Sequence, residues 1–226
     1  MDKITLDDNT QEIQDEIIKI FESRGNKLTT GEVISFNEIG AKILTHDQRE
    51  GFLPVTEFYP NKKFILGAKY HFVVIEERPR MILSTTNSFL IQGLIEGLVP
   101  EIREGKVRVM SVARRIGIRS KIAVASTSDE IDAVGVCIGK AANRVKALIE
   151  MLNNERVDIV PYHSDLKIFI NNAMGVKVTE ISFAGDVARV SVPSHQYQAA
   201  LGGGGLNASL ASRLTGIKIM VEVDEK

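Results

Sequence analysis

The 226-residue chain has one cysteine, no tryptophan, and few aromatic residues of any kind, 6% in all. With Cys137 alone, no intrachain disulfide can form, so we expect a reducing, cytoplasmic environment. No apolar run approaches the roughly 18–20 residues that a membrane-spanning helix needs, so we expect no membrane association of that kind. The polar N-terminal stretch MDKITLDDNT predicts neither a secretory signal nor a basic transit peptide.

Charge of one sign is not in excess either, since 28 basic residues stand against 29 acidic ones. A nucleic-acid partner would therefore need a local basic patch rather than a globally basic protein. Residues 103–121 (REGKVRVMSVARRIGIRSK) offer such a patch, with Glu104 as the one acidic residue. The run is either a solvated strand face or a site for an anionic partner. Its basic residues are Arg103, Lys106, Arg108, Arg114, Arg115, Arg119 and Lys121.

Motifs of common catalytic and metal sites are also missing. The chain has no Cys-x-x-Cys or His-x-x-x-His spacing for a metal and no Gly-x-Ser-x-Gly nucleophile turn. The acidic segment STSDEID (126–132) is typical of a helix start, where carboxylates cap backbone amides. We therefore expect no enzyme activity, no cofactor and no metal site.

The first half of the chain changes from a helical to a strand-like pattern. Apolar spacing predicts a helix over 9–24 and another over 87–98, the second closed by Pro100. Between them, turn residues separate five short runs rich in β-branched and aromatic residues. Five strands within about 55 residues predict a small closed barrel of the OB type. The runs are 31–36, 41–45, 51–55, 68–76 and 80–85.

The second half has the pattern of a duplication. Each copy has two strands, a helix, a glycine-containing turn, a second helix and a last strand, and a repeated turn is a stronger signal than a single one. The turns are IGKAANRV (138–145) and LGGGGLNA (201–208), with Gly139 and Gly202 at equivalent places. The expected strands are 107–114, 120–126 and 156–161 in the first copy, and 177–184, 187–193 and 217–223 in the second, which a helix at 164–174 precedes.

A glycine-rich turn that leads into a helix presents backbone amides and the positive end of the helix dipole, so a phosphate backbone can lie against it. The P-loop fits poorly, because GVCIGKA (135–141) has one spacer residue too few and Ala141 in place of the magnesium-binding hydroxyl. The dinucleotide fingerprint would need glycine where Asn207 stands. The remaining candidate is the GXXG loop of a KH module, which clamps about four nucleotides of single-stranded backbone.

Several segments, in this order along the chain, resemble the NusA family of bacterial transcription factors. The resemblance implies an OB barrel of the ribosomal S-one type followed by two KH modules of type II topology. It also implies a factor that binds nascent single-stranded RNA and modulates pausing, termination and antitermination by RNA polymerase. The segments are RSKIAVAS (119–126), IDAVGVCIG (131–139), RVKALIEMLNNERVDIV (144–160), FINNA (169–173) and LASRLTGIKI (210–219).

The chain departs from the family pattern in both turns and at its start. Only the helix expected over 9–24 precedes the barrel where the family has a polymerase-binding domain, so contact with RNA polymerase is left open. The first turn ends in Ala142 instead of glycine, and alanine suits the first turn of a following helix. The second turn has Gly203 and Ser209 where the family usually has Lys and Arg, so it lacks a cation of its own.

The barrel also departs from the family pattern. Ile39 and Lys42 stand where base-stacking aromatic residues are usual, so we expect little stacking from the barrel. Phe36, Phe52 and Phe72 could stack on bases, but a position in the barrel core is the stronger expectation for each.

Together these patterns predict an α+β fold, a five-stranded OB-type β-barrel followed by two type II KH α/β modules. The expected parts are an N-terminal helical segment at 1–27, the barrel at 28–86, a connecting helix at 87–104, and KH modules at 105–162 and 163–226.

The expected function is non-catalytic binding of single-stranded RNA by a monomeric, cytoplasmic transcription factor. Two other functions stay open: an RNA chaperone or ribosome-associated KH protein that does not contact polymerase, and a KH-fold protein-interaction scaffold with little RNA binding. The residues expected to contact RNA are Arg108, Arg119, Lys121, Gly139, Lys140, Ala141, Arg144, Lys146, Gly202, Gly203, Gly204, Gly205 and Asn207.

Overall fold

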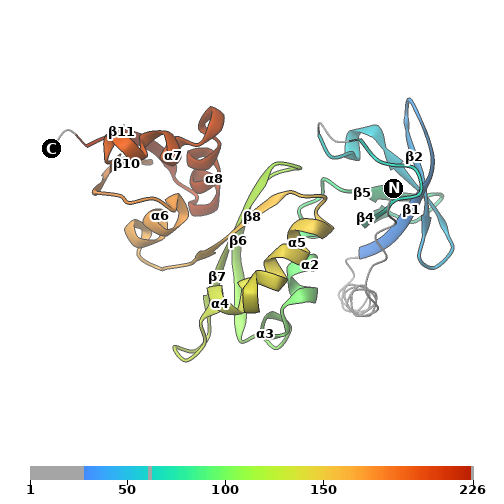
Figure 1. Cartoon of the computed structure of the whole chain (residues 1–226), viewed down its shortest axis with the longest axis horizontal. Coiled ribbons are helices and arrows are strands. Elements are labelled where there is room, and N and C mark those ends of the chain that lie inside the picture. Colours follow the sequence, from blue (N-terminus) through green and yellow to red (C-terminus); the bar gives the residue numbers. More distant parts are fainter. Residues whose placement is uncertain (1–27, 61–62, 225–226) are drawn as a thin grey trace. The chain divides into compact units, whose positions relative to one another are not determined.

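The computed structural model describes residues 28–60 and 63–224, so the helix expected over 9–24 lies outside the described residues. The chain divides into two compact units. The first comprises the residues up to Arg103 together with Ala142–Glu155, and the second comprises Glu104–Ala141 together with the residues from Arg156 onward. Figure 1 labels most of the helices and strands of both units.

Five strands of the first unit close into the barrel that the sequence predicts. Their order around the barrel is β1-β2-β3-β5-β4, and β4 pairs with β1 to close it. The short β3–β5 pairing is parallel and the other pairings are antiparallel. The strands are β1 (Leu28–Asn37), β2 (Gly40–Thr45), β3 (Glu50–Pro54), β4 (Lys69–Glu76) and β5 (Met81–Ser84), and a 3-10 turn, η1 (Val55–Glu57), follows β3.

Alternating apolar residues fill the barrel, because successive side chains of a strand point to opposite faces. Val33, Ile43 and Phe72 are among the side chains that are completely buried there. At the start of β2 the strands approach each other closely, since a Cβ added to Gly40 would lie 2.3 Å from the carbonyl oxygen of Leu53. The barrel therefore needs glycine at this position.

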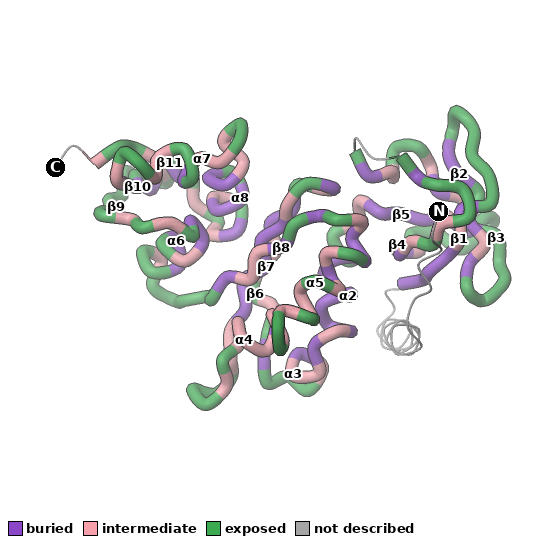
Figure 2. Tube along the Cα trace, in the orientation of Figure 1, coloured by how far each residue is buried: buried purple, intermediate pink, exposed green. Residues whose placement is uncertain are grey.

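Three helices belong to the same unit as the barrel. They are α2 (Phe89–Leu98), α3 (Pro100–Arg103) and α5 (Asn143–Met151). The helix α2 is buried along most of its length (Figure 2), as expected for a helix that is apolar nearly all round. It ends before Pro100, as the sequence predicts, and Pro100 then opens α3, where a missing amide costs nothing.

The second unit contains two three-stranded sheets built on one plan. In each, an antiparallel hairpin is extended by a third strand parallel to the middle one, which is the pattern expected of a duplication. The first sheet is β6 (Val107–Arg115), β7 (Arg119–Ser126) and β8 (Arg156–Pro161). The second is β9 (Glu180–Ala184), β10 (Val187–Val192) and β11 (Lys218–Val223).

The helices of the second unit are α4 (Ala133–Ile138), α6 (Leu166–Met174), α7 (Tyr197–Leu201) and α8 (Leu206–Thr215). The acidic segment before α4 caps that helix as predicted, since the Asp132 carboxylate accepts hydrogen bonds from the amides of Val134 and Gly135. Cys137 packs in the interior of the protein.

One hydrophobic core joins the first sheet to the helices α6 and α8. Ala113 and Ala123 of that sheet belong to the same buried cluster as Leu210 and Leu214 of α8. A hydrogen bond reinforces the contact, from the Ser111 hydroxyl to the Leu214 carbonyl oxygen at 2.9 Å. The helix that follows the second glycine turn is thereby fixed against the sheet of the first module.

Candidate nucleic-acid interface

The first glycine turn, Gly139–Ala142, joins α4 to α5. Gly139 has φ 77° and ψ 168°, Ala141 has φ 52° and ψ 27°, and Ala142 has φ 62° and ψ 26°. The last two residues thus lie in the left-handed region, which costs a non-glycine residue about 1–2 kcal/mol. The expectation that Ala142 belongs to the first turn of the next helix is wrong, because α5 begins only at Asn143.

The second glycine turn, Gly202–Gly205, joins α7 to α8 and repeats this backbone. Gly202 has φ 71° and ψ 168°, Gly204 has φ 60° and ψ 26°, and Gly205 has φ 75° and ψ 13°. Each residue matches its counterpart in the first turn within about 15°. Gly203 and Gly204 are exposed, as are Lys140 and Ala141 in the first turn. The two turns therefore present one backbone shape twice.

The residue five places after the first glycine of each turn fastens the outgoing helix. Asn207 is only 4% exposed, and its side-chain amide donates to the carbonyl oxygens of Met174 and Ala200, both at 3.0 Å. Arg144, at the equivalent place, donates from Nη1 to the Glu101 carboxylate at 2.9 Å. Both residues were expected to contact RNA, and both have structural partners that the sequence pattern did not reveal.

Two of the seven basic residues of the run, Arg119 and Lys121, pair with the Asp158 carboxylate, which lies far from them in the sequence. Arg119 makes two parallel hydrogen bonds to the Asp158 carboxylate, at 2.9 and 3.0 Å. The Lys121 ammonium lies 2.9 Å from the same carboxylate, and its side chain is 3% exposed. These residues are neighbours because β7 and β8 pair in parallel with Lys121 opposite Asp158.

Burial and pairing shift the pKa values of this cluster. Burial lowers the pKa of Lys121 below its ordinary value, and the Asp158 carboxylate opposes that shift. Burial raises the pKa of Asp158, but the hydrogen bonds from Arg119 and Lys121 outweigh it, and the pKa lies below its ordinary value. Lys121 is thus part of the interior of the protein, and Arg119 is half-buried beside it.

Other cations of the predicted site face solvent. Lys140 is exposed in the first turn, Lys146 is exposed on α5, and Arg108 is exposed on β6. Lys106 pairs with Glu104 on the surface. Fewer basic side chains are therefore exposed and available to a phosphate than the basic run alone suggests.

The barrel offers a weaker surface for nucleic acid. Phe72 lies in the core as expected, but the same expectation is wrong for Phe36, which is 53% exposed. Phe52 is half-buried, and the guanidinium carbon of Arg80 lies 4.3 Å from its ring centre. Lys42 is 3.4 Å from the Glu50 carboxylate. The exposed Phe36 ring is open to stacking with a base, but Glu50 partly neutralises the neighbouring Lys42, which weakens attraction for phosphate.

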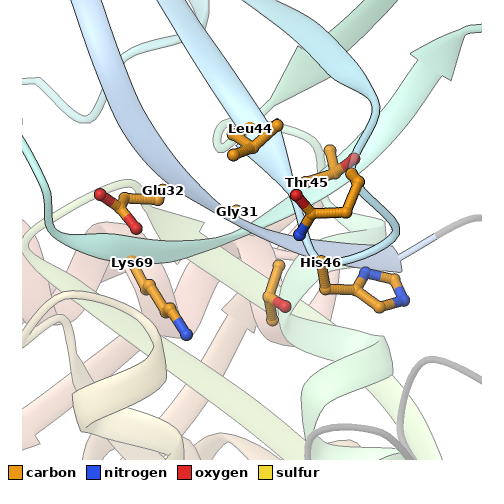
Figure 3. A pocket seen from close by; sticks show the side chains of 8 residues that line it. Gly31, Glu32, Leu44, Thr45, His46 and Lys69 are labelled. Atoms are coloured by element: carbon orange, nitrogen blue, oxygen red, sulfur yellow. The ribbon is translucent and has the colours of Figure 1, made fainter.

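A pocket of about 260 Å³ lies on the barrel between β1, β2 and β4. Figure 3 shows Glu32 and Lys69 at one side, Thr45 and His46 at the other, and Gly31 between them. The Nδ1 atom of His46 is 3.2 Å from the Thr29 hydroxyl. Since a carboxylate and an ammonium both line the pocket, it lacks the concentrated positive charge that a phosphate chain requires.

Within residues 28–60 and 63–224, no helix is both long and apolar enough to span a bilayer. No group of three or more His, Cys, Asp and Glu side chains in the same residues is arranged to hold a metal ion.

Comparison with known families matches the two halves of the duplication separately. Residues 85–162 match the NusA-like first KH domain, and residues 166–226 match the NusA-like second KH domain. The first match begins before α2, so the repeated unit of the family includes the helix that precedes the first sheet, as α6 precedes the second.

Curated relatives point to the same family. The transcription termination/antitermination protein NusA of Thermus thermophilus is 33% identical over 213 residues, which are 91% of this chain and 55% of that protein. The NusA proteins of Mycobacterium bovis and Bacillus subtilis are each 37% identical, over 77% and 76% of this chain and 53% and 49% of their own lengths. The chain thus spans about half the length of these relatives. With both NusA-like KH domains present in order, the chain belongs to the NusA family.

Proposed function

We propose that this chain is a non-catalytic RNA-binding factor that holds nascent single-stranded RNA and modulates transcription pausing, termination and antitermination. One observation carries the proposal: two exposed turns of the same backbone shape, each leading into a helix, in two NusA-like KH domains. Such a loop clamps about four nucleotides of single-stranded backbone, so two loops accept about eight.

The contact residues in this proposal are the two turns together with the exposed cations. In the first module these are Arg108, Lys140 and Lys146, which can neutralise phosphates. Gly139 and Ala141, and Gly202 through Gly205, supply backbone that phosphates can approach closely. Arg144 and Asn207 secure the helices that follow the turns, and Arg119 and Lys121 pair with Asp158 within the first sheet.

The relatives favour this function over an RNA chaperone and over a protein scaffold with little RNA binding, since all three relatives described above are named as transcription termination/antitermination proteins. Contact with RNA polymerase is part of the proposal. A pull-down of core polymerase with the chain, with and without RNA, tests this part alone.

A competition experiment tests the RNA-binding part. A labelled single-stranded RNA of twelve nucleotides, bound to the chain, is challenged with unlabelled single-stranded RNA or with duplex RNA of the same length. We expect the single strand to compete well and the duplex poorly, because an A-form duplex hides its base edges in a deep, narrow groove. Equal competition by both would mean attraction by charge alone and would refute the proposal.

A further inference from the structure

The second glycine turn has no cation of its own, yet it borders a pocket that is lined by two arginine side chains. The pocket measures about 390 Å³ and lies between this turn and the β6–β7 hairpin of the first module. Gly203, Gly204 and Ser209 line one side, and Arg115 and Ile118 line the other, with Arg213 of α8 also in the lining. All these residues belong to the second compact unit.

The two sides of the pocket are fastened together. Arg213 donates from Nη1 to the Arg114 carbonyl oxygen at 2.9 Å, which ties α8 to the end of β6. The Ser111–Leu214 hydrogen bond and the shared apolar core hold the same pair of elements. The distance between the hairpin and the glycine turn is therefore set by packing, which gives a preformed site.

Arg115 is available to an anionic ligand. It lies exposed at the end of β6, and no carboxylate in the described part of the chain pairs with it, in contrast to Arg119 and Lys121 on the neighbouring strand. A guanidinium presents five donors in a planar fork that fits a phosphate. Arg213 uses one of its donors for the hydrogen bond to the Arg114 carbonyl oxygen, and the others face no such partner in the described residues.

The rest of the lining suits the apolar parts of a nucleotide. Ile118 is 41% exposed at the tip of the hairpin, and Leu206 is half-buried at the start of α8. The Ser209 hydroxyl adds a neutral donor and acceptor. A volume of a few hundred cubic ångströms lies within the range of small-ligand sites.

We propose that Arg115 of the first module, with Arg213, supplies the positive charge that the second glycine turn lacks, so that this pocket holds one phosphate and its nucleoside from a single-stranded RNA. The inference rests on the proposed RNA binding and adds a named contact to it. The second turn contributes shape, and the hairpin of the preceding module contributes charge.

Fluorescence anisotropy with a labelled twelve-nucleotide single-stranded RNA tests this assignment on the 226-residue chain. Arg115→Ala should weaken binding about tenfold, or roughly 1.4 kcal/mol. It should also reduce the slope of log K against log salt by about 0.7, the value for one phosphate contact with a single strand. The matched control is Arg189→Ala, an exposed arginine of β10 outside the pocket, which should change affinity less than twofold.

A rescue variant separates a charge effect from a structural one. Gly203 has no positive φ, and a Cβ there would meet nothing within 4 Å, so Gly203→Lys fits without strain. Added to Arg115→Ala, Gly203→Lys should restore most of the lost affinity, because it returns a cation to the same pocket.

Three outcomes would overturn the assignment. Equal affinities for the Arg115→Ala and Arg189→Ala variants would refute it while leaving the proposed function intact. An affinity loss that Gly203→Lys fails to restore would mean that Arg115 acts on the fold rather than on RNA. An unmutated chain that does not bind the RNA at all would overturn both the assignment and the proposed function.

Discussion

The two glycine turns share a backbone and differ in where their charge comes from. At the second position of the turn the first has Lys140 and the second has Gly203, and the residues that follow have nearly equal φ and ψ in both. The first turn reaches this shape with Ala141 and Ala142, at a conformational cost, and the second reaches it with glycine. The first turn carries its own cation, whereas the second borders Arg115 and Arg213.

The comparison separates two properties that a phosphate-binding loop needs. Shape comes from the local backbone, and alanine can supply it when the surrounding helices hold the turn in place. Charge can come from any element packed beside the turn, so its absence from the local sequence does not show that the site is weak. A duplicated module can therefore lack a cation in one loop while an element packed beside that loop supplies the positive charge.

Acidification should destabilise α5, the helix that follows the first turn, more than α8, the helix that follows the second. His71 of β4 is buried with a ring hydrogen bond to the Met151 backbone at the end of α5, and burial lowers its pKa to about 4. The unfolded chain binds the proton with an ordinary pKa of about 6.5, so the unfolding free energy should fall as the pH drops from 6.5 to 4. The total loss is about 3 kcal/mol and is absent above pH 6.5.

Hydrogen exchange of backbone amides at pH 7 and pH 4.5 measures this effect. The α5 amides should lose protection at the lower pH more than the α8 amides, which belong to the other unit. His71→Gln removes the titrating group. In this variant the extra loss of protection in α5 at the lower pH should therefore be absent. Equal losses of protection in α5 with and without His71 would contradict the assignment.

An aspartate at the equivalent second position of each turn sharpens the comparison of the turns themselves. Lys140→Asp changes the local charge by two, and Gly203→Asp changes it by one. Neither position has positive φ. We expect a loss of RNA affinity of about tenfold or more for Lys140→Asp, or at least roughly 1.4 kcal/mol, and a smaller loss for Gly203→Asp. Thermal unfolding should be nearly unchanged in both.

Binding titrations of the two variants at one salt concentration rank the turns. Lys218→Asp, at an exposed position of β11, is a control for nonspecific charge effects. If Gly203→Asp costs more affinity than Lys140→Asp while both remain folded, the second turn is the principal RNA clamp and the ranking is wrong.

The smallest effect should come from relieving the strain in the first turn. Ala141→Gly places glycine where φ is 52° and should stabilise the protein by about 0.5–1 kcal/mol. The opposite result is expected at Ala147 inside α5, where Ala147→Gly should destabilise by a similar amount. Chemical denaturation of both variants checks the signs, and a destabilising Ala141→Gly would mean that the left-handed conformation is not strained.

Sequence patterns predicted the elements well because those patterns are local. The five strand-like runs lie within one to three residues of the observed barrel strands, and the repeated order of strands, helices and turns follows from hydrophobic spacing and glycine. Ala142 is the instructive failure. Helix propensity favours a helical conformation there, and the closing geometry of the turn overrides it.

The site was predicted less completely because its partners are distant in the chain. Lys121 and Asp158 meet only through the parallel pairing of β7 with β8, and Arg115 approaches Gly203 only through the packing of α8 on the first sheet. No local pattern reveals which cations are neutralised or which turn they border. The sequence does offer one signal, since Arg144 and Asn207 stand at equivalent places, five residues after the first glycine of each turn. In the structure both residues secure a helix.

The salt dependence of RNA affinity tests the central claim most directly, that two glycine turns and exposed cations of the KH modules hold single-stranded RNA. Four exposed cations are assigned to phosphates, Arg108, Arg115, Lys140 and Lys146. At about 0.7 per contact, log K should fall with log salt with a slope of roughly −3 for an unstructured single strand. A slope near zero would contradict the account.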